Sequence, residues 1–271
     1  MSVAEENQVE NQVEKPVEDN QKLVWVSLYG GTGLFQWNHT EDAVTSEPAL
    51  AHGGGVGINF RVVDWLEVST GARVSFFSPE MKVDDYNVSM MAVDNEGDEY
   101  EKRISASRIV EEQEFVWAGF PLSIRYVFNP GRWDLYAEAG GEYCLALKSS
   151  FDQTGRFSHH GYYSEYDLYI DDLPSNGFYD EKTLTSIGEL DPESFIMPFV
   201  AAGLVFPGEA ALFFIEGRYY MPGNDPFSEK QDLLFEGPLN NESVFTFSNE
   251  SVMKSGKVTL SGFRGVIGIR F

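Results

Sequence analysis

The sequence predicts an all-β fold, namely an eight-stranded antiparallel up-and-down transmembrane β-barrel. Three observations predict it. Apolar and polar residues alternate over segments of about 10 to 15 residues, as in strands that separate two environments. The connections between these segments are alternately long and short. No stretch approaches the roughly 18 consecutive apolar residues that would indicate a membrane-spanning helix.

The chain divides into two parts. Residues 1–21 are rich in Glu, Gln and Asn and lack an apolar face, which predicts a disordered acidic N-terminal tail. Residues 22–271 are predicted to form the barrel. The residues after Met1 contain no apolar signal-peptide core, so we expect that the leader required for export has been removed.

Eight segments show the alternation expected of strands. Taken in order, they are Leu23–Trp37, His52–Val62, Trp65–Phe77, Glu112–Phe128, Trp133–Leu147, Ser194–Phe206, Ala211–Met221 and Lys257–Phe271. Tight turns rich in Pro, Gly, Asn and Asp join three pairs, at 63–64, 129–132 and 207–209. The other four connections, 39–48, 78–111, 148–193 and 222–256, are predicted to be long loops. Bacterial outer-membrane barrels show this asymmetry, with short periplasmic turns and long external loops.

The two faces of the strands differ in polarity, and two arrangements fit. In a water-soluble barrel of lipocalin type the apolar face would fill the core, whereas in a membrane barrel it would face lipid. The strand charges are nearly balanced and no Lys lies in mid-strand, which favours a closed, paired interior. An eight-stranded barrel has room inside only for side chains. We therefore predict a plugged interior built from a charge network of Arg61, Glu67, Arg73, Arg125, Glu138, Glu142, Glu216, Arg218, Arg264 and Arg270.

Aromatic residues near the strand ends support the membrane arrangement. Trp and Tyr form girdles at the two membrane interfaces of such barrels. The candidates here are Trp25, Trp37, Trp65, Trp117, Trp133, Tyr126, Tyr219 and Tyr220.

Composition limits the partners and cofactors. The formal net charge of −24 disfavours nucleic acid. Cys144 is the single cysteine, so no intrachain disulfide and no CxxC metal pair can form. No motif has the spacing of a catalytic, metal or cofactor site, so we expect a non-enzymatic protein without a cofactor.

Two segments resemble a known family. Residues 120–126 (FPLSIRY), a turn, and residues 135–143 (LYAEAGGEY) resemble the PorT-like and OmpX-like outer-membrane β-barrel family. Alternate apolar residues before a terminal aromatic, Phe263, Ile267, Ile269 and Phe271, look like the signal that barrel assembly machinery reads. The resemblance implies a place in the bacterial outer membrane, with lipid and that machinery as partners.

Function is predicted to lie in the external loops, because a fold of this kind does not itself define an activity. The candidates for ligand binding are His159, His160, Tyr162, Tyr163 and Tyr166, which cluster in the longest loop. Our leading hypothesis is a surface barrel whose acidic, aromatic loops bind a ligand or an envelope partner, or a subunit of an envelope complex. The alternatives are a narrow channel with porin-like transport and a membrane-embedded enzyme.

Overall fold

The computed structural model describes residues 23–94, 96–129, 133–227, 229–230 and 250–271. Within them the chain forms twelve antiparallel strands and two short 3-10 helices, which confirms the all-β prediction. These elements are β1 (Val24–His39), β2 (Val44–Ser46), β3 (Ala49–Val63), β4 (Leu66–Phe77), β5 (Glu80–Val93), β6 (Glu99–Phe128), β7 (Asp134–Tyr163), β8 (Leu168–Ile170), η1 (Pro174–Asn176), β9 (Tyr179–Glu189), β10 (Phe195–Pro207), β11 (Leu212–Tyr220), η2 (Val252–Lys254) and β12 (Val258–Arg270). In this part of the chain no helix is long and apolar enough to cross a membrane. The predicted tail, residues 1–21, lies outside the described residues.

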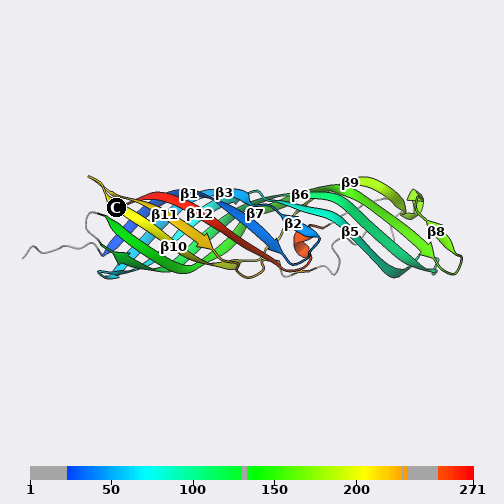
Figure 1. Cartoon of the computed structure of the whole chain (residues 1–271), viewed down its shortest axis with the longest axis horizontal. Coiled ribbons are helices and arrows are strands. Elements are labelled where there is room, and N and C mark those ends of the chain that lie inside the picture. The colour runs from blue at the N-terminus through cyan, green and yellow to red at the C-terminus, as the bar shows by residue number, and fades with distance from the viewer. Residues whose placement is uncertain (1–22, 95, 130–132, 228, 231–249) are drawn as a thin grey trace, which may run out of the picture.

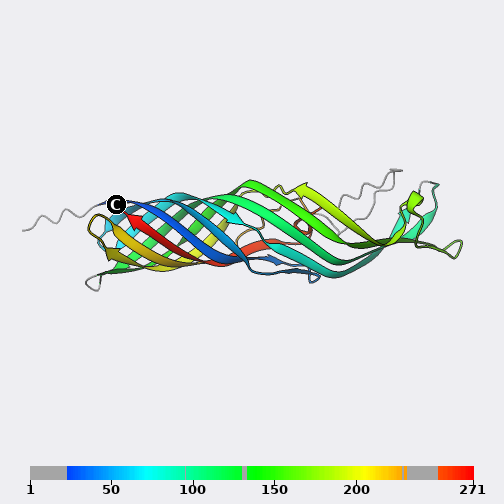
Figure 2. The same cartoon turned by 90° about the horizontal axis from the view of Figure 1, so that it is seen from above.

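Eight of the strands pair in a closed circuit. Its order is β1, β3, β4, β6, β7, β10, β11 and β12, and β12 pairs with β1 again. Figures 1 and 2 show these strands wound around one long axis, with the C-terminus at one end of the molecule. We call this circuit the barrel; it encloses a lumen lined by alternate residues of each strand.

Two strands continue far beyond the barrel. β6 and β7 are each 30 residues long, and their outer halves pair with each other. β5 pairs with the outer half of β6, while β8 and β9 pair with that of β7. We call this sheet, residues 80–114 and 148–189, the arm (right half of Figure 1).

The arm corrects the prediction of long loops at 78–111 and 148–193. Those segments were predicted to be loops because they are rich in charged residues. The charges lie mainly on the outward face, while alternate positions such as Ile104, Ala106 and Ile109 are buried. The alternation that defines a strand therefore continues through both segments, with a register shift in β6 between Ser107 and Val110.

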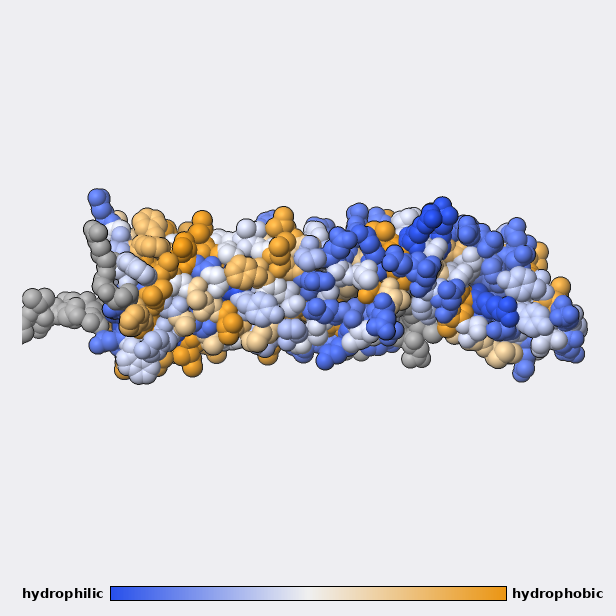
Figure 3. Space-filling view, viewed as in Figure 1, coloured by the Kyte–Doolittle hydropathy of each residue, from blue (hydrophilic) through white to orange (hydrophobic). Residues whose placement is uncertain are grey.

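The outer surface changes character along the long axis. Outward residues of the barrel strands are apolar and exposed, for example Leu122 at 63% and Ile267 at 67%. Outward residues of the arm include Glu112 and Glu114. Figure 3 shows the same division on one face, with hydrophobic side chains gathered over the barrel and hydrophilic ones over the arm.

The lumen has two layers. The half near the C-terminus holds the charged residues, and the half near the arm holds an apolar core that includes Phe35, Phe77 and Phe115. Three of the residues predicted in the aromatic girdles, Trp37, Trp117 and Tyr220, belong to this inner core and are at most 5% exposed. That part of the girdle prediction is wrong, because position near a strand end does not reveal which face a side chain occupies. Of the other girdle candidates, Trp65, Trp133, Tyr126 and Tyr219 are exposed, and Trp25 is half-buried.

Candidate functional site

The charged layer of the lumen begins with three arginines around one glutamate. Glu67 on β4 lies 3.3 Å from Arg270, 3.6 Å from Arg125 and 3.7 Å from Arg61. Its carboxylate is 1% exposed. The three arginines come from β12, β6 and β3, so this cluster joins strands from different parts of the circuit.

A second cluster lies around two more glutamates. Glu138 accepts hydrogen bonds from Arg125 at 2.6 Å and from Ser123 at 2.6 Å, and it pairs with Arg218 at 3.3 Å. Glu216 pairs with Arg218 at 2.8 Å and accepts a hydrogen bond from the Tyr136 hydroxyl at 2.8 Å. Buried charges are tolerated when they are paired and hydrogen-bonded in this way.

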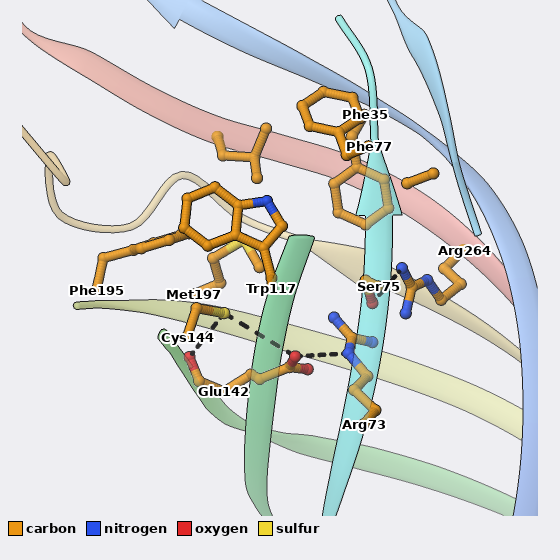
Figure 4. Close-up of a pocket in the computed structure, with 12 residues that line it drawn as sticks. Phe35, Arg73, Ser75, Phe77, Trp117, Glu142, Cys144, Phe195, Met197 and Arg264 are labelled. Atoms are coloured by element: carbon orange, nitrogen blue, oxygen red, sulfur yellow. Dashed lines mark hydrogen bonds and ion pairs between the residues drawn. The ribbon is translucent and has the colours of Figure 1, made fainter. Parts of the chain in front are cut away.

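The charge network borders the apolar core around Arg73 and Glu142, as Figure 4 shows. Arg73 pairs with Glu142 at 2.6 Å, and the Tyr220 hydroxyl donates to the same carboxylate at 3.1 Å. Arg264 differs from the other network arginines, since its Nη2 donates to Ser75 Oγ at 3.1 Å and no carboxylate of the described residues lies within 4.0 Å. The structure thus places all ten predicted network residues in the lumen and leaves one of them without an ion pair.

A buried glutamate that sequence reasoning missed binds Ser251 and Val252, just before β12, in the lumen. Glu111 on β6 accepts hydrogen bonds from Ser251 Oγ, from the Val252 backbone N–H at 3.0 Å and from Gln153 at 2.8 Å. Val252 and Met253 of η2 are fully buried in the apolar core. Burial raises the pKa of the Glu111 carboxyl, although these hydrogen bonds oppose the shift. We call residues 250–257 the plug segment.

The five candidate loop residues lie at the far end of the arm and divide between its faces. His159 is 2% exposed, stacks on Phe178 at 5.1 Å, and hydrogen-bonds through Nδ1 to the Gly177 carbonyl at 2.6 Å. Tyr163 is also buried and donates to Asp94 at 3.1 Å. Desolvation lowers the pKa of His159 to about 4, and burial together with the Asp94 hydrogen bond raises the pKa of Tyr163 to about 12. These two side chains therefore form part of the arm's interior.

The other candidates lie on the opposite face or in the turn. His160 accepts from or donates to the Tyr169 hydroxyl at 2.7 Å and lies 3.2 Å from Asp180. Tyr162 donates to Asp167 at 3.0 Å. Tyr166 is 56% exposed in the turn before β8, and its hydroxyl lies 3.4 Å from Asp98.

A polar groove of about 350 Å³ crosses this outer face. It is lined by Asn87, Val88, Ser89, Glu101, Arg103, Ile104, Ser105 and His160. Arg103 pairs with Glu101 at 2.6 Å and lies over the rings of Tyr162 and Tyr169, at 5.4 and 5.8 Å from their centroids. Arg103 and Tyr169 were missed from the sequence because they come from segments predicted as separate loops. No group of three or more metal-ligating side chains occurs in the described parts of the chain.

The predicted assembly signal lies on the outside of β12. Phe263, Ile267 and Phe271 are 55%, 67% and 51% exposed, and Ile269 has the same outward parity. The face is therefore accessible, as the prediction requires.

Comparison with known proteins gives structural matches alone. No protein family matches the sequence, and no curated protein sequence does. The chain is similar to the outer membrane protein OprG from Pseudomonas aeruginosa, with 10% identity, 91% of this chain and 94% of that chain covered, and a TM-score of 0.42. It is also similar to Ail, the attachment invasion locus protein of Yersinia pestis, with 11% identity, 91% and 98% covered, and a TM-score of 0.31. At TM-scores below 0.5 no property of either protein is carried over to this chain.

Proposed function

We propose that this chain is an eight-stranded outer-membrane β-barrel with a sealed, non-conducting lumen, and that its arm binds a partner outside the cell. The observation that carries the proposal is a reversal of polarity along single strands. In the barrel part of β6, outward Leu122 and Ile124 are apolar while inward Arg125 is charged and buried. In the arm part, outward Glu112 is charged while inward Ile109 is apolar and buried.

This reversal is what a strand crossing from lipid into water requires. A lipid-facing surface must be apolar, whereas a water-facing sheet buries apolar residues on its inner side. A water-soluble barrel of lipocalin type would keep apolar residues inside along its whole length. The polarity change near Glu114 and Lys148, which pair at 2.6 Å on the outer face, supports a membrane surface at that level.

The contents of the lumen support a sealed barrel over a narrow channel. Ion pairs fill one half, and the fully buried Trp37, Phe115 and Met253 belong to the core of the other half. Passage of an ion would require both layers to move.

The arm supports recognition as the activity. It carries 19 acidic and 7 basic residues in the ranges 80–114 and 148–189, so its field favours a partner with basic groups. Aromatic rings beside polar side chains, as around Arg103, are frequent at binding surfaces because they offer both stacking and hydrogen bonding.

In-cell photo-crosslinking tests the proposal. In one variant a photoreactive side chain replaces Tyr169 beside the groove. In the matched control it replaces Tyr219 on the outer surface of the barrel. The proposal expects a discrete cross-linked partner from position 169, lost when Arg103→Ala is added, and no such product from position 219. A folded, surface-exposed chain that gives no cross-link at 169 and shows stepwise conductance in planar bilayers would instead favour a channel.

A further inference from the structure

A second binding feature lies inside the lumen, where the charged layer meets the apolar core. Arg264 on β12 is 2% exposed and lies directly across from Arg218 on β11. Its guanidinium donates to Ser75 Oγ and lies 5.5 Å from the Phe35 ring centroid. Its Nε has no hydrogen-bond acceptor, and no carboxylate of the described residues pairs with it. Figure 4 shows Arg264 and Ser75 on the opposite side of the pocket from Met197 and Phe195.

Charge in this layer is out of balance. The predicted network contains six arginines and four glutamates, and the other five arginines account for the carboxylates by pairing with them. An arginine side chain in a protein cannot become neutral by losing a proton. An unpaired buried guanidinium is costly, so this site requires a further negative charge.

The cavity next to Arg264 limits the size of the anion that could supply this negative charge. It measures about 20 Å³, and its polar lining residues are Arg73, Ser75, Glu142 and Arg264, with Cys144, Trp117 and Met197 among the others. A cavity of this size holds one water-sized particle. A carboxylate, phosphate or sulfate is much larger than this space, whereas a single-atom anion is only slightly larger than a water molecule and requires the least displacement of the walls.

Hydrogen-bond donors converge on the same cavity. Ser75 Oγ accepts from Arg264, which leaves the Ser75 hydroxyl hydrogen available to donate. Arg73 and Glu142 both line the cavity and pair with each other at 2.6 Å, so together they add no net charge and Arg264 is the unpaired positive charge at this site. The remaining walls are largely apolar, which strengthens an ion pair by excluding water.

We propose that this cavity binds one halide ion, chloride under physiological conditions, held by Arg264 and Ser75. The ion neutralises the buried guanidinium and fixes Arg264 between the charge network and the aromatic core. This proposal does not depend on what the arm binds.

The first test is diffraction from crystals of the full chain grown in bromide. The proposal expects an anomalous bromide peak in the cavity within hydrogen-bond reach of Arg264. A peak-free cavity holding a water molecule would overturn it.

The second test is unfolding of the full chain in lipid vesicles, with chloride exchanged for gluconate at constant ionic strength. Gluconate is too large for the cavity. For one site, the unfolding equilibrium constant should fall about tenfold for each tenfold rise in chloride above its dissociation constant. Arg264→Gln should abolish this response, and Ser75→Ala should shift it to higher chloride without preventing folding.

Arg270→Gln is the matched control, because it removes another buried arginine that pairs with Glu67 away from the cavity. It should keep the wild-type chloride response. An unchanged response in Ser75→Ala and in Arg264→Gln, or equal stability of the wild type in chloride and gluconate, would contradict the halide site.

Discussion

Acidification is predicted to loosen the tip of the arm, because His159 is held there in its neutral form. Nδ1 donates to the Gly177 carbonyl, so in the neutral ring Nε2 carries no proton, and it is buried without a hydrogen-bond partner among the described residues. Protonation would place a charge between Phe178 and Tyr179, where Lys102 and His160 add positive charge and no described side chain accepts a hydrogen bond from Nε2. The imidazolium can be accommodated by opening the tip to water.

The size of the effect follows from the pKa of His159, which is lowered from 6.5 to about 4 in the closed tip. An open tip binds the proton more tightly, so this contribution to stability is complete above pH 6.5 and is lost as the pH falls toward 4. Between pH 7.5 and pH 5 the loss is about 2 kcal/mol, which is roughly a 30-fold rise in the opening constant.

Amide hydrogen exchange of the full chain in nanodiscs, corrected for the intrinsic effect of pH, measures this opening. Protection at residues 177–179 should fall by roughly 30-fold between pH 7.5 and pH 5, while the barrel strands keep theirs. His159→Gln should remove the pH dependence, whereas His160→Gln, which changes the neighbour on the opposite face, should retain it. Equal protection of the wild-type tip at both pH values would refute the reasoning.

Three further predictions concern the barrel and its plug. Glu138→Ala leaves Arg125 and Arg218 without a main partner and should destabilise the barrel by about 3–5 kcal/mol in denaturant unfolding from lipid vesicles. Leu122→Arg, on the proposed lipid face, should cost about 2–4 kcal/mol in the same assay, and an equal loss from Glu112→Arg on the arm would contradict the proposed membrane level. Glu111→Ala leaves buried donors of the plug segment unsatisfied, which should destabilise the bound position of this segment by about 1–3 kcal/mol. Limited proteolysis should therefore cut within 250–257 while the barrel stays folded. Continued resistance there would disprove the anchoring role.

The facing of the barrel strands could be predicted from the sequence because two strong local signals coincide there. Period-two alternation assigns each side chain to a face, and the tight turns define where the strands end. Arg125 and Glu138 were therefore expected in the lumen, and the structure places both there, 2.6 Å apart. Both signals are local in the sequence, so the face of each side chain can be predicted without knowing which strands pair with each other.

The arm and the plug segment could not be predicted from the sequence for the opposite reason. Glu111 contacts Ser251 across 140 positions of the chain, and no local pattern specifies a contact of that range. In the arm, the apolar positions are mixed with buried polar residues such as Lys102 and Gln153, which hides the alternation. The aromatic residues misled for a related reason, because Trp37 and Trp117 satisfy the rule for girdle residues by position but belong to the inward parity.

The plug segment also explains how the lumen stays closed where β6 and β7 extend beyond the barrel into the arm. β6 and β7 diverge from the barrel just beyond Phe115 and Cys144, where β4 and β10 no longer pair with them. The circuit loses its β4–β6 and β7–β10 pairings at that level and only β6 and β7 continue, so the lumen would be open to water there. Glu111 binds the plug segment at this level, and Met253 completes the apolar core beneath it. Closure at the mouth therefore depends on a buried carboxylate and a distant loop, while closure at the other end depends on ion pairs. Because the two seals share no residue, removal of Glu111 should expose the mouth without conductance, and conductance should require a change in the charge network as well.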